Sequence, residues 1–169
     1  MDETTFTVTL SVLLIAAIVT GIILGRRNRT KRQQYIAVPA VVPDNLLENE
    51  PLASAEGTYV TTVLGQELLE RVTAHQLGNR SQAQLEVHTT GVVVLRVGEP
   101  NFFIPVEAIT DTATISGMAG KFVEKDGIFA ITWQLEDTEV TTGFRTETIG
   151  EYQALRTHLD HLTNGRHTA

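Results

Sequence analysis

The stretch Gly117-Met118-Ala119-Gly120-Lys121 looks most like a site for chemistry, because its glycines and lysine suggest a phosphate loop. Such a loop needs four residues between its glycines and a Ser or Thr after the lysine to bind phosphate and Mg²⁺. Here two residues separate the glycines, and Phe122 follows the lysine. We therefore interpret Gly117–Lys121 as a glycine-rich turn between strands. An exposed Met118 beside Lys121 would make this turn a contact surface for a partner.

Other reactive residue types do not combine into a catalytic or metal-binding pattern. His158 and His161 lie near the end of a predicted helix, where histidines commonly complement the helix dipole, and a metal needs at least three converging ligands. Ser116 lacks the first glycine of a nucleophile elbow, and the carboxylates of residues 136–139 are typical of a solvated hairpin tip. The chain contains no cysteine. We predict that it is not an enzyme and needs no metal or cofactor.

The N-terminal residues predict a transmembrane helix over residues 6–25, after a short tail at 1–5. Phe6–Leu24 is an uncharged run of 19 residues. As a helix it spans roughly 28 Å, close to the hydrocarbon thickness of about 30 Å. Acidic residues precede the run and basic ones follow it, which is the reverse of a cleaved signal peptide. A buried core helix is the alternative, although such helices are seldom uncharged over this length.

The basic residues after this run set the expected orientation. Five of the 13 Lys and Arg residues follow it closely: Arg26, Arg27, Arg29, Lys31 and Arg32. The positive-inside rule then places the C-terminal side in the cytoplasm, the N-terminus outside and the protein in the cell membrane as a single-pass chain. The same charges attract anionic lipid, at about 1 kcal/mol each. The lipid bilayer is therefore the first predicted partner.

Residues 26–56 are interpreted as a basic stop signal followed by a linker. Pro39, Pro43 and Pro51 interrupt any helix or central strand in this segment. A flexible tether of this length would let a domain move on the order of 25–30 Å from its anchor. The alternative is that the apolar run Tyr35–Val42 docks on the membrane surface or on the domain.

Residues 57–169 predict one cytoplasmic domain of short strands separated by turns. Apolar and β-branched runs and turn residues predict antiparallel pairing. The predicted strands are 59–64, 83–88, 92–97, 102–105, 128–135 and 139–144, with two shorter strands inside 111–124. About seven strands in total indicate a mainly β, α+β fold with a strongly bent sheet or barrel.

A terminal amphipathic helix is expected to close that sheet. Thr148 and Glu151 have the spacing of a capping box, and Gly165 supplies a stop. Apolar residues then recur every three or four positions and define one buried face. These residues are Ile149, Tyr152, Leu155, Leu159 and Leu162.

The charge of this domain argues against nucleic acid as a partner. Residues 57–169 hold 8 Lys or Arg and 14 Asp or Glu, which gives about −6, and the whole chain has a net charge of −7. A nucleic-acid-binding protein needs a basic face that displaces counterions from phosphate. We therefore predict no nucleic-acid binding.

Several segments resemble actinobacterial single-pass membrane proteins that carry a pleckstrin-homology-like (bacterial PH) domain. The resemblance implies a PH-like fold for the cytoplasmic domain, and it brings no catalytic residues. Members of that group are often labelled as transport or export proteins, and their genes often lie near pyrimidine-synthesis genes. Phosphoinositide-binding PH domains cluster basic residues near their first hairpin, whereas Gly65–Arg71 here holds two glutamates and one arginine. The resembling segments are Gly57–Val60, Arg71–His75, Phe103–Pro105, Gly117–Lys121 and Thr142–Arg145.

Three functional hypotheses follow. The first is a non-catalytic, membrane-anchored scaffold or adaptor whose domain binds a protein partner through an exposed sheet edge or the terminal helix. The second is an accessory subunit of a transporter or envelope machine that acts through its membrane helix. The third is a domain that binds lipid or a small ligand.

Overall fold

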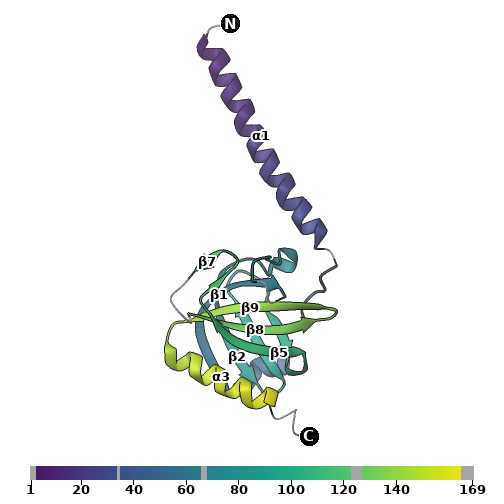
Figure 1. Ribbon diagram of the computed structural model, residues 1–169, viewed down its shortest axis with the longest axis vertical. Helices are drawn as coiled ribbons and strands as arrows, with labels where there is room; N and C mark the ends of the chain where they lie inside the picture. The colour runs from purple at the N-terminus through teal and green to yellow at the C-terminus, as the bar shows by residue number, and fades with distance from the viewer. Residues whose placement is uncertain (1–2, 34, 66–67, 123–126, 165–169) are drawn as a thin grey trace. The chain divides into compact units, whose positions relative to one another are not determined.

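The computed structural model describes residues 3–33, 35–65, 68–122 and 127–164 (Figure 1). The chain divides into two compact units, Met1–Tyr35 and Ile36–Ala169. The first unit is almost entirely one helix, and the second holds the β-sheet and two further helices.

The helix α1 (Glu3–Arg32) forms the first unit. Its segment Val8–Gly25 is long and apolar enough to cross a membrane, and no part of that segment is buried in the protein. The helix is longer than the predicted 6–25, because it continues through the basic residues to Arg32. Lys and Arg are good helix formers, so nothing in this stretch ends the helix. The side chains of the basic cluster lie outside the described residues.

The second unit is built on a seven-stranded antiparallel sheet, as predicted. Its strand order is β4-β3-β2-β1-β9-β8-β5, and a separate small hairpin pairs β6 with β7. The predicted strands 102–105 and 128–135 have the observed bounds, while the first strand begins six residues earlier than predicted. The strands are β1 (Ala53–Leu64), β2 (Ser81–His88), β3 (Gly91–Arg96), β4 (Phe102–Pro105), β5 (Ile109–Ile115), β6 (Gly117–Met118), β7 (Lys121–Phe122), β8 (Ile128–Leu135) and β9 (Thr138–Thr146).

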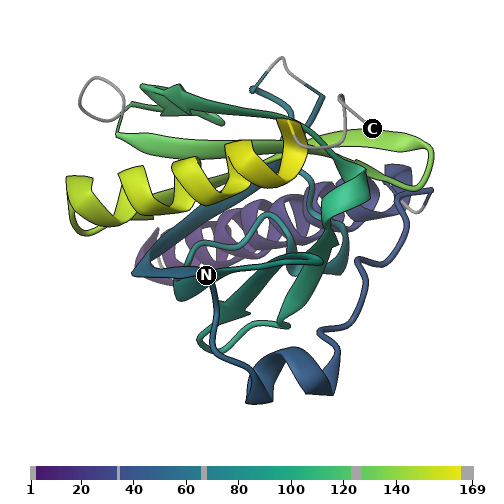
Figure 2. The same ribbon diagram turned by 90° about the horizontal axis from the view of Figure 1, so that it is seen from below.

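The main core lies between the concave face of the sheet and the helix α3 (Ile149–Asn164). Leu155 and Leu159 are fully buried there, in the same cluster as Trp133 and Phe144. Tyr152 packs edge-on against the ring of Phe129. The predicted apolar face of the terminal helix is therefore confirmed at its described positions, and Figure 2 shows α3, in yellow, crossing the sheet.

The predicted capping box begins α3. The Glu151 N–H donates to the Thr148 hydroxyl at 3.4 Å, and the Thr148 N–H donates to the Glu151 carboxylate at 3.3 Å. These reciprocal bonds satisfy N–H groups that a helix start leaves without partners. Gly165, the predicted stop, lies outside the described residues.

The segment predicted to be a tether is part of the domain. Ile36 joins the main core, and Val42 and Leu46 pack on Val93 and Phe103 on the other face of the sheet. Leu46 lies in the short helix α2 (Asp44–Glu48). Burial of these three side chains stabilises the folded conformation of the segment. The spacing of its prolines does not indicate this burial. This segment docks on the domain, as one alternative predicted, and the prediction of a flexible tether was wrong.

Candidate functional site

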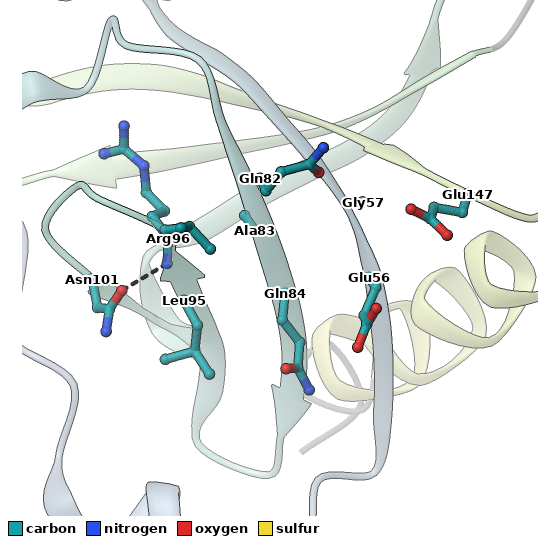
Figure 3. A pocket seen from close by; sticks show the side chains of 10 residues that line it. Glu56, Gly57, Gln82, Ala83, Gln84, Leu95, Arg96, Asn101 and Glu147 are labelled. Carbon is teal, nitrogen blue, oxygen red and sulfur yellow. Dashed lines mark hydrogen bonds between the residues drawn. The ribbon is translucent and has the colours of Figure 1, made fainter.

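A groove of about 510 Å³ lies over the sheet where β1, β2 and β3 run side by side (Figure 3). Successive strand residues point to opposite faces, so residues in register form rows across the sheet. One such row joins Glu56, Gln84 and Leu95. Gln82 and Glu147 extend the polar lining to either side. The groove therefore offers amides, carboxylates and a small apolar area to a ligand.

The charge of this groove does not suit an anionic ligand. Glu56 and Glu147 contribute carboxylates. Arg96 borders the groove, but its guanidinium points away from Glu56 and Gln84 in Figure 3. Over residues 36–169 the chain holds 8 Lys or Arg and 18 Asp or Glu, a formal charge of −10. Coulomb repulsion therefore opposes a phosphate headgroup here.

Arg96 is buried beneath the groove as a structural cation. Its guanidinium stacks 4.1 Å from the ring centre of Tyr59, and its Nη2 donates to the carbonyls of Gln76 and Asn79 at 3.0 and 2.8 Å. Burial lowers the pKa of Arg96 from its ordinary value, and the nearby Glu99 acts in the opposite direction. The side chain ties β3 to the loop before β2 by cation–π and charge-assisted hydrogen bonds.

A series of buried hydrogen bonds runs from Trp133 through the Tyr59 hydroxyl to the Leu77 carbonyl, and each bond is donated in the same direction. Trp133 Nε1 can only donate, and it does so to Thr142 Oγ1 at 3.0 Å. The Thr142 hydroxyl lies 2.9 Å from that of Thr62, which lies 2.6 Å from the Tyr59 hydroxyl. Tyr59 donates to the carbonyl of Leu77 at 2.6 Å, so each hydroxyl has one consistent proton direction. Burial raises the pKa of Tyr59 well above its ordinary value, which keeps the phenol protonated.

Replacing Arg96 with methionine should destabilise the domain by about 2–4 kcal/mol. The apolar side chain fills part of the space but leaves two carbonyls and the neighbouring Glu99 without their cation. Urea unfolding of the full chain against the Arg96→Lys variant measures the effect. Lysine keeps the charge but not the planar stacking on Tyr59, so an intermediate loss is expected. Equal stability of the Met variant and the parent would contradict the structural role of this cation.

The two edges of the sheet differ in their exposure to a new strand. At β4, the Phe103 N–H donates to the Ala40 carbonyl at 2.8 Å, so the segment before α2 covers that edge. At the other end, β5 pairs with β8 on one side, and no strand among the described residues pairs with its second side. Thr110, Asp111 and Ala113 on β5 are exposed. An uncovered edge presents unpaired backbone groups and is a ready template for another chain.

The predicted contact turn Gly117–Lys121 is a tight hairpin of β6 and β7. The expected exposure of Met118 was wrong: its side chain is 2% exposed and packs with Val60, Val63 and Ile128. Gly143 makes room for it, because a Cβ there would lie 2.6 Å from the Met118 sulfur. The Lys121 side chain lies outside the described residues, so a contact role for this turn stays a prediction.

Two histidines have buried or backbone partners that the sequence did not indicate. The His88 side chain on β2 is 4% exposed and lies 3.2 Å from the Glu86 carboxylate, which also accepts from Gln84 at 3.0 Å. His75 Nε2 lies 2.9 Å from the Ile36 carbonyl, so it must donate there. No group of three His, Asp or Glu residues suited to a metal occurs among the described residues. The His75 contact joins residues 39 positions apart, so local spacing could not reveal it, whereas His88 and Glu86 lie two residues apart on β2.

A bent antiparallel sheet closed by a C-terminal helix defines a PH-like domain. The Bacterial PH domain-like family matches residues 36–160, and the chain belongs to that family. No curated protein matches the chain. A solved structure of Vav1 inhibited by an allosteric inhibitor matches 83% of this chain with a TM-score of 0.43 and 11% identity. The chain spans 34% of the length of that structure.

Proposed function

We propose that this protein is a membrane-anchored adaptor whose PH-like domain binds a protein partner in the cytoplasm. PH-like domains serve generally as binding modules, and this one follows a helix that is apolar enough to cross a membrane. The positive charges of Arg26–Arg32 support a cytoplasmic position for the domain. The actinobacterial origin and the transport label that the resemblance implies stay predictions.

The open edge of β5 is the observation that carries this proposal. The opposite edge is covered by the Ala40 segment, so the exposure of β5 is particular to one end of the sheet. The helix α3 packs beside β5. An added strand could therefore contact the side chains of α3 as well as bond to the backbone of β5. Strand addition of this kind binds extended peptides through main-chain hydrogen bonds.

Electrostatics favour a protein partner over an anionic lipid surface. Residues 1–35 hold 5 basic and 2 acidic residues, whereas residues 36–169 have a formal charge of −10. The anionic inner leaflet therefore attracts the N-terminal basic residues and repels the domain. This supports a division of roles in which α1 provides attachment and the domain provides recognition.

Site-specific cross-linking in intact membranes tests the adaptor function. A photoreactive residue at Ala113 of the full chain should capture one protein reproducibly, and another exposed position, Leu69, should not. Replacing Phe6–Leu24 with an unrelated apolar helix should leave the yield of that complex within about twofold, because a non-specific anchor is sufficient for an adaptor. The absence of any capture through the domain would contradict the proposal.

The accessory-subunit alternative makes the opposite prediction for the helix replacement. Gly21 and Gly25 are spaced four apart on α1, and apart from the adjoining helix backbone no described atom lies within 4 Å of a Cβ built at either. Small residues at this spacing allow close helix packing in membranes. Loss of the complex on helix replacement, with cross-links at α1 instead of Ala113, would favour that alternative.

A further inference from the structure

At the open edge of β5, the side chain of Asp111 occupies a backbone N–H of the same strand. The Thr112 N–H donates to the Asp111 carboxylate at 2.8 Å. The register with β8 shifts between Ile109 and Asp111, which places this contact directly after a bulge. A bulge re-aims side chains and commonly ends or protects pairing at a sheet edge.

This hydrogen bond shows which backbone N–H groups of β5 face away from β8. An N–H that bonds to an exposed carboxylate is not part of the ladder with β8, so the Thr112 N–H faces the open side. N–H groups two residues apart in a strand point to the same side, which makes the Thr114 N–H another outward donor. An incoming strand could bond to Thr114 at once, but it must displace Asp111 to reach Thr112.

Asp111 differs in its ion pairing from Asp160, an acidic residue on α3 that contacts the neighbouring Thr112. The Asp160 carboxylate accepts from the Thr112 hydroxyl at 3.1 Å and forms an ion pair with Arg156 at 3.5 Å. Among the described residues, no ion pair joins Asp111 to a Lys or Arg. Asp111 therefore provides an unmatched negative charge at the point where an added strand would pass.

We infer that the Asp111 carboxylate acts as a latch on the β5 edge, which means that it occupies the Thr112 N–H until a partner strand displaces it. The partner strand is an extended segment of another protein with a Lys or Arg facing Asp111. The partner's backbone carbonyl replaces the carboxylate at the Thr112 N–H, and its cation pairs with the released carboxylate. This inference rests on the proposed adaptor function and names the chemistry of the partner. The formal charge of −10 on residues 36–169 favours the same basic segment.

Hydrogen exchange of the full chain in detergent micelles tests the latch without any ligand. Asp111→Ala removes the acceptor, so exchange of the Thr112 amide should become about tenfold faster. Asp111→Asn is the matched control, because its side-chain oxygen still accepts while its charge is gone, and it should retain most of the protection. Unchanged exchange in the Ala variant would overturn the latch.

Selection from phage-displayed random 12-residue peptides on the same full chain tests the occupant. The selected peptides should be enriched in Lys and Arg over Asp and Glu, and a photoreactive residue at Ala113 should capture them. Asp111→Asn should abolish the basic preference. Thr114→Pro, which removes an outward donor, should weaken binding at least tenfold while the thermal midpoint stays within a few degrees.

Three outcomes would overturn the inference. They are no enrichment of basic peptides, capture through Gln82 in the groove in place of Ala113, and a dimer of Asp111→Ala in which two β5 edges pair. Capture in the groove would leave the adaptor function standing, because only the location of the partner would have changed. If Thr114→Pro fails to fold, the Ala113 capture and the Asp111→Asn preference still decide the matter.

Discussion

Replacing Leu155 with aspartate is expected to unfold the PH-like domain under conditions in which the parent is fully folded. The Leu155 side chain is fully buried at the contact of α3 with the sheet. Its loss removes about 2–3 kcal/mol of hydrophobic burial. A carboxylate placed there without a partner costs several kcal/mol more. Together these terms approach the entire stability of a small domain, about 5–15 kcal/mol.

Far-UV circular dichroism and urea unfolding of the full chain measure this effect. Leu155→Met is the matched control within the core, because it nearly conserves volume and should cost under about 1.5 kcal/mol. Gln153→Asp places the same carboxylate on an exposed position of the same helix and should leave the midpoint almost unchanged. A Leu155→Asp variant that unfolds at the parent's urea midpoint would show that α3 does not close the core.

Deleting residues 1–25 is expected to transfer the protein from the membrane to the soluble fraction. The segment Val8–Gly25 can provide effectively irreversible insertion, whereas the five basic residues that remain give only a few kcal/mol of lipid attraction, which salt screens. The acidic domain reduces that attraction further. The full chain should resist high-salt and alkaline washing and need detergent for its release.

Sedimentation with lipid vesicles of defined composition separates the possible causes of any residual binding. The truncated protein should stay in solution with vesicles that contain anionic lipid, at physiological salt. Binding to such vesicles would reveal a lipid-binding role for the domain. Binding to native membranes alone would instead indicate a resident protein partner, as the adaptor function requires.

The sheet and its closing helix could be predicted because their signals are local. Alternation places Leu85 and Val87 on the core face of β2, and the spacing of Tyr152, Leu155 and Leu159 defines one face of α3. The turn residues between strands fixed most hairpins to within two residues. Such patterns depend only on neighbours along the chain, so they survive without any knowledge of the three-dimensional contacts.

The features that the sequence did not reveal depend on contacts between distant segments. Residues 36–48 look like a proline-containing linker until Val93 and Phe103 are seen to offer them an apolar face. Met118 looks exposed in its glycine-rich turn until Gly143, on another strand, opens a space for it. The groove and the β5 edge likewise require the strand order, which hairpin signals alone do not determine.

The hydrogen-bond chain that begins at Trp133 has an optical consequence. The chain contains one tryptophan, and its indole is 1% exposed among apolar side chains with its N–H fixed on Thr142. Its fluorescence should therefore peak at short wavelength in the folded protein and shift to longer wavelength when water reaches the ring. Because Phe102 stacks on the same ring at 6.2 Å, the emission reports on the centre of the core, where β4 meets β8. A single intrinsic fluorophore thus follows the unfolding of this domain without labelling.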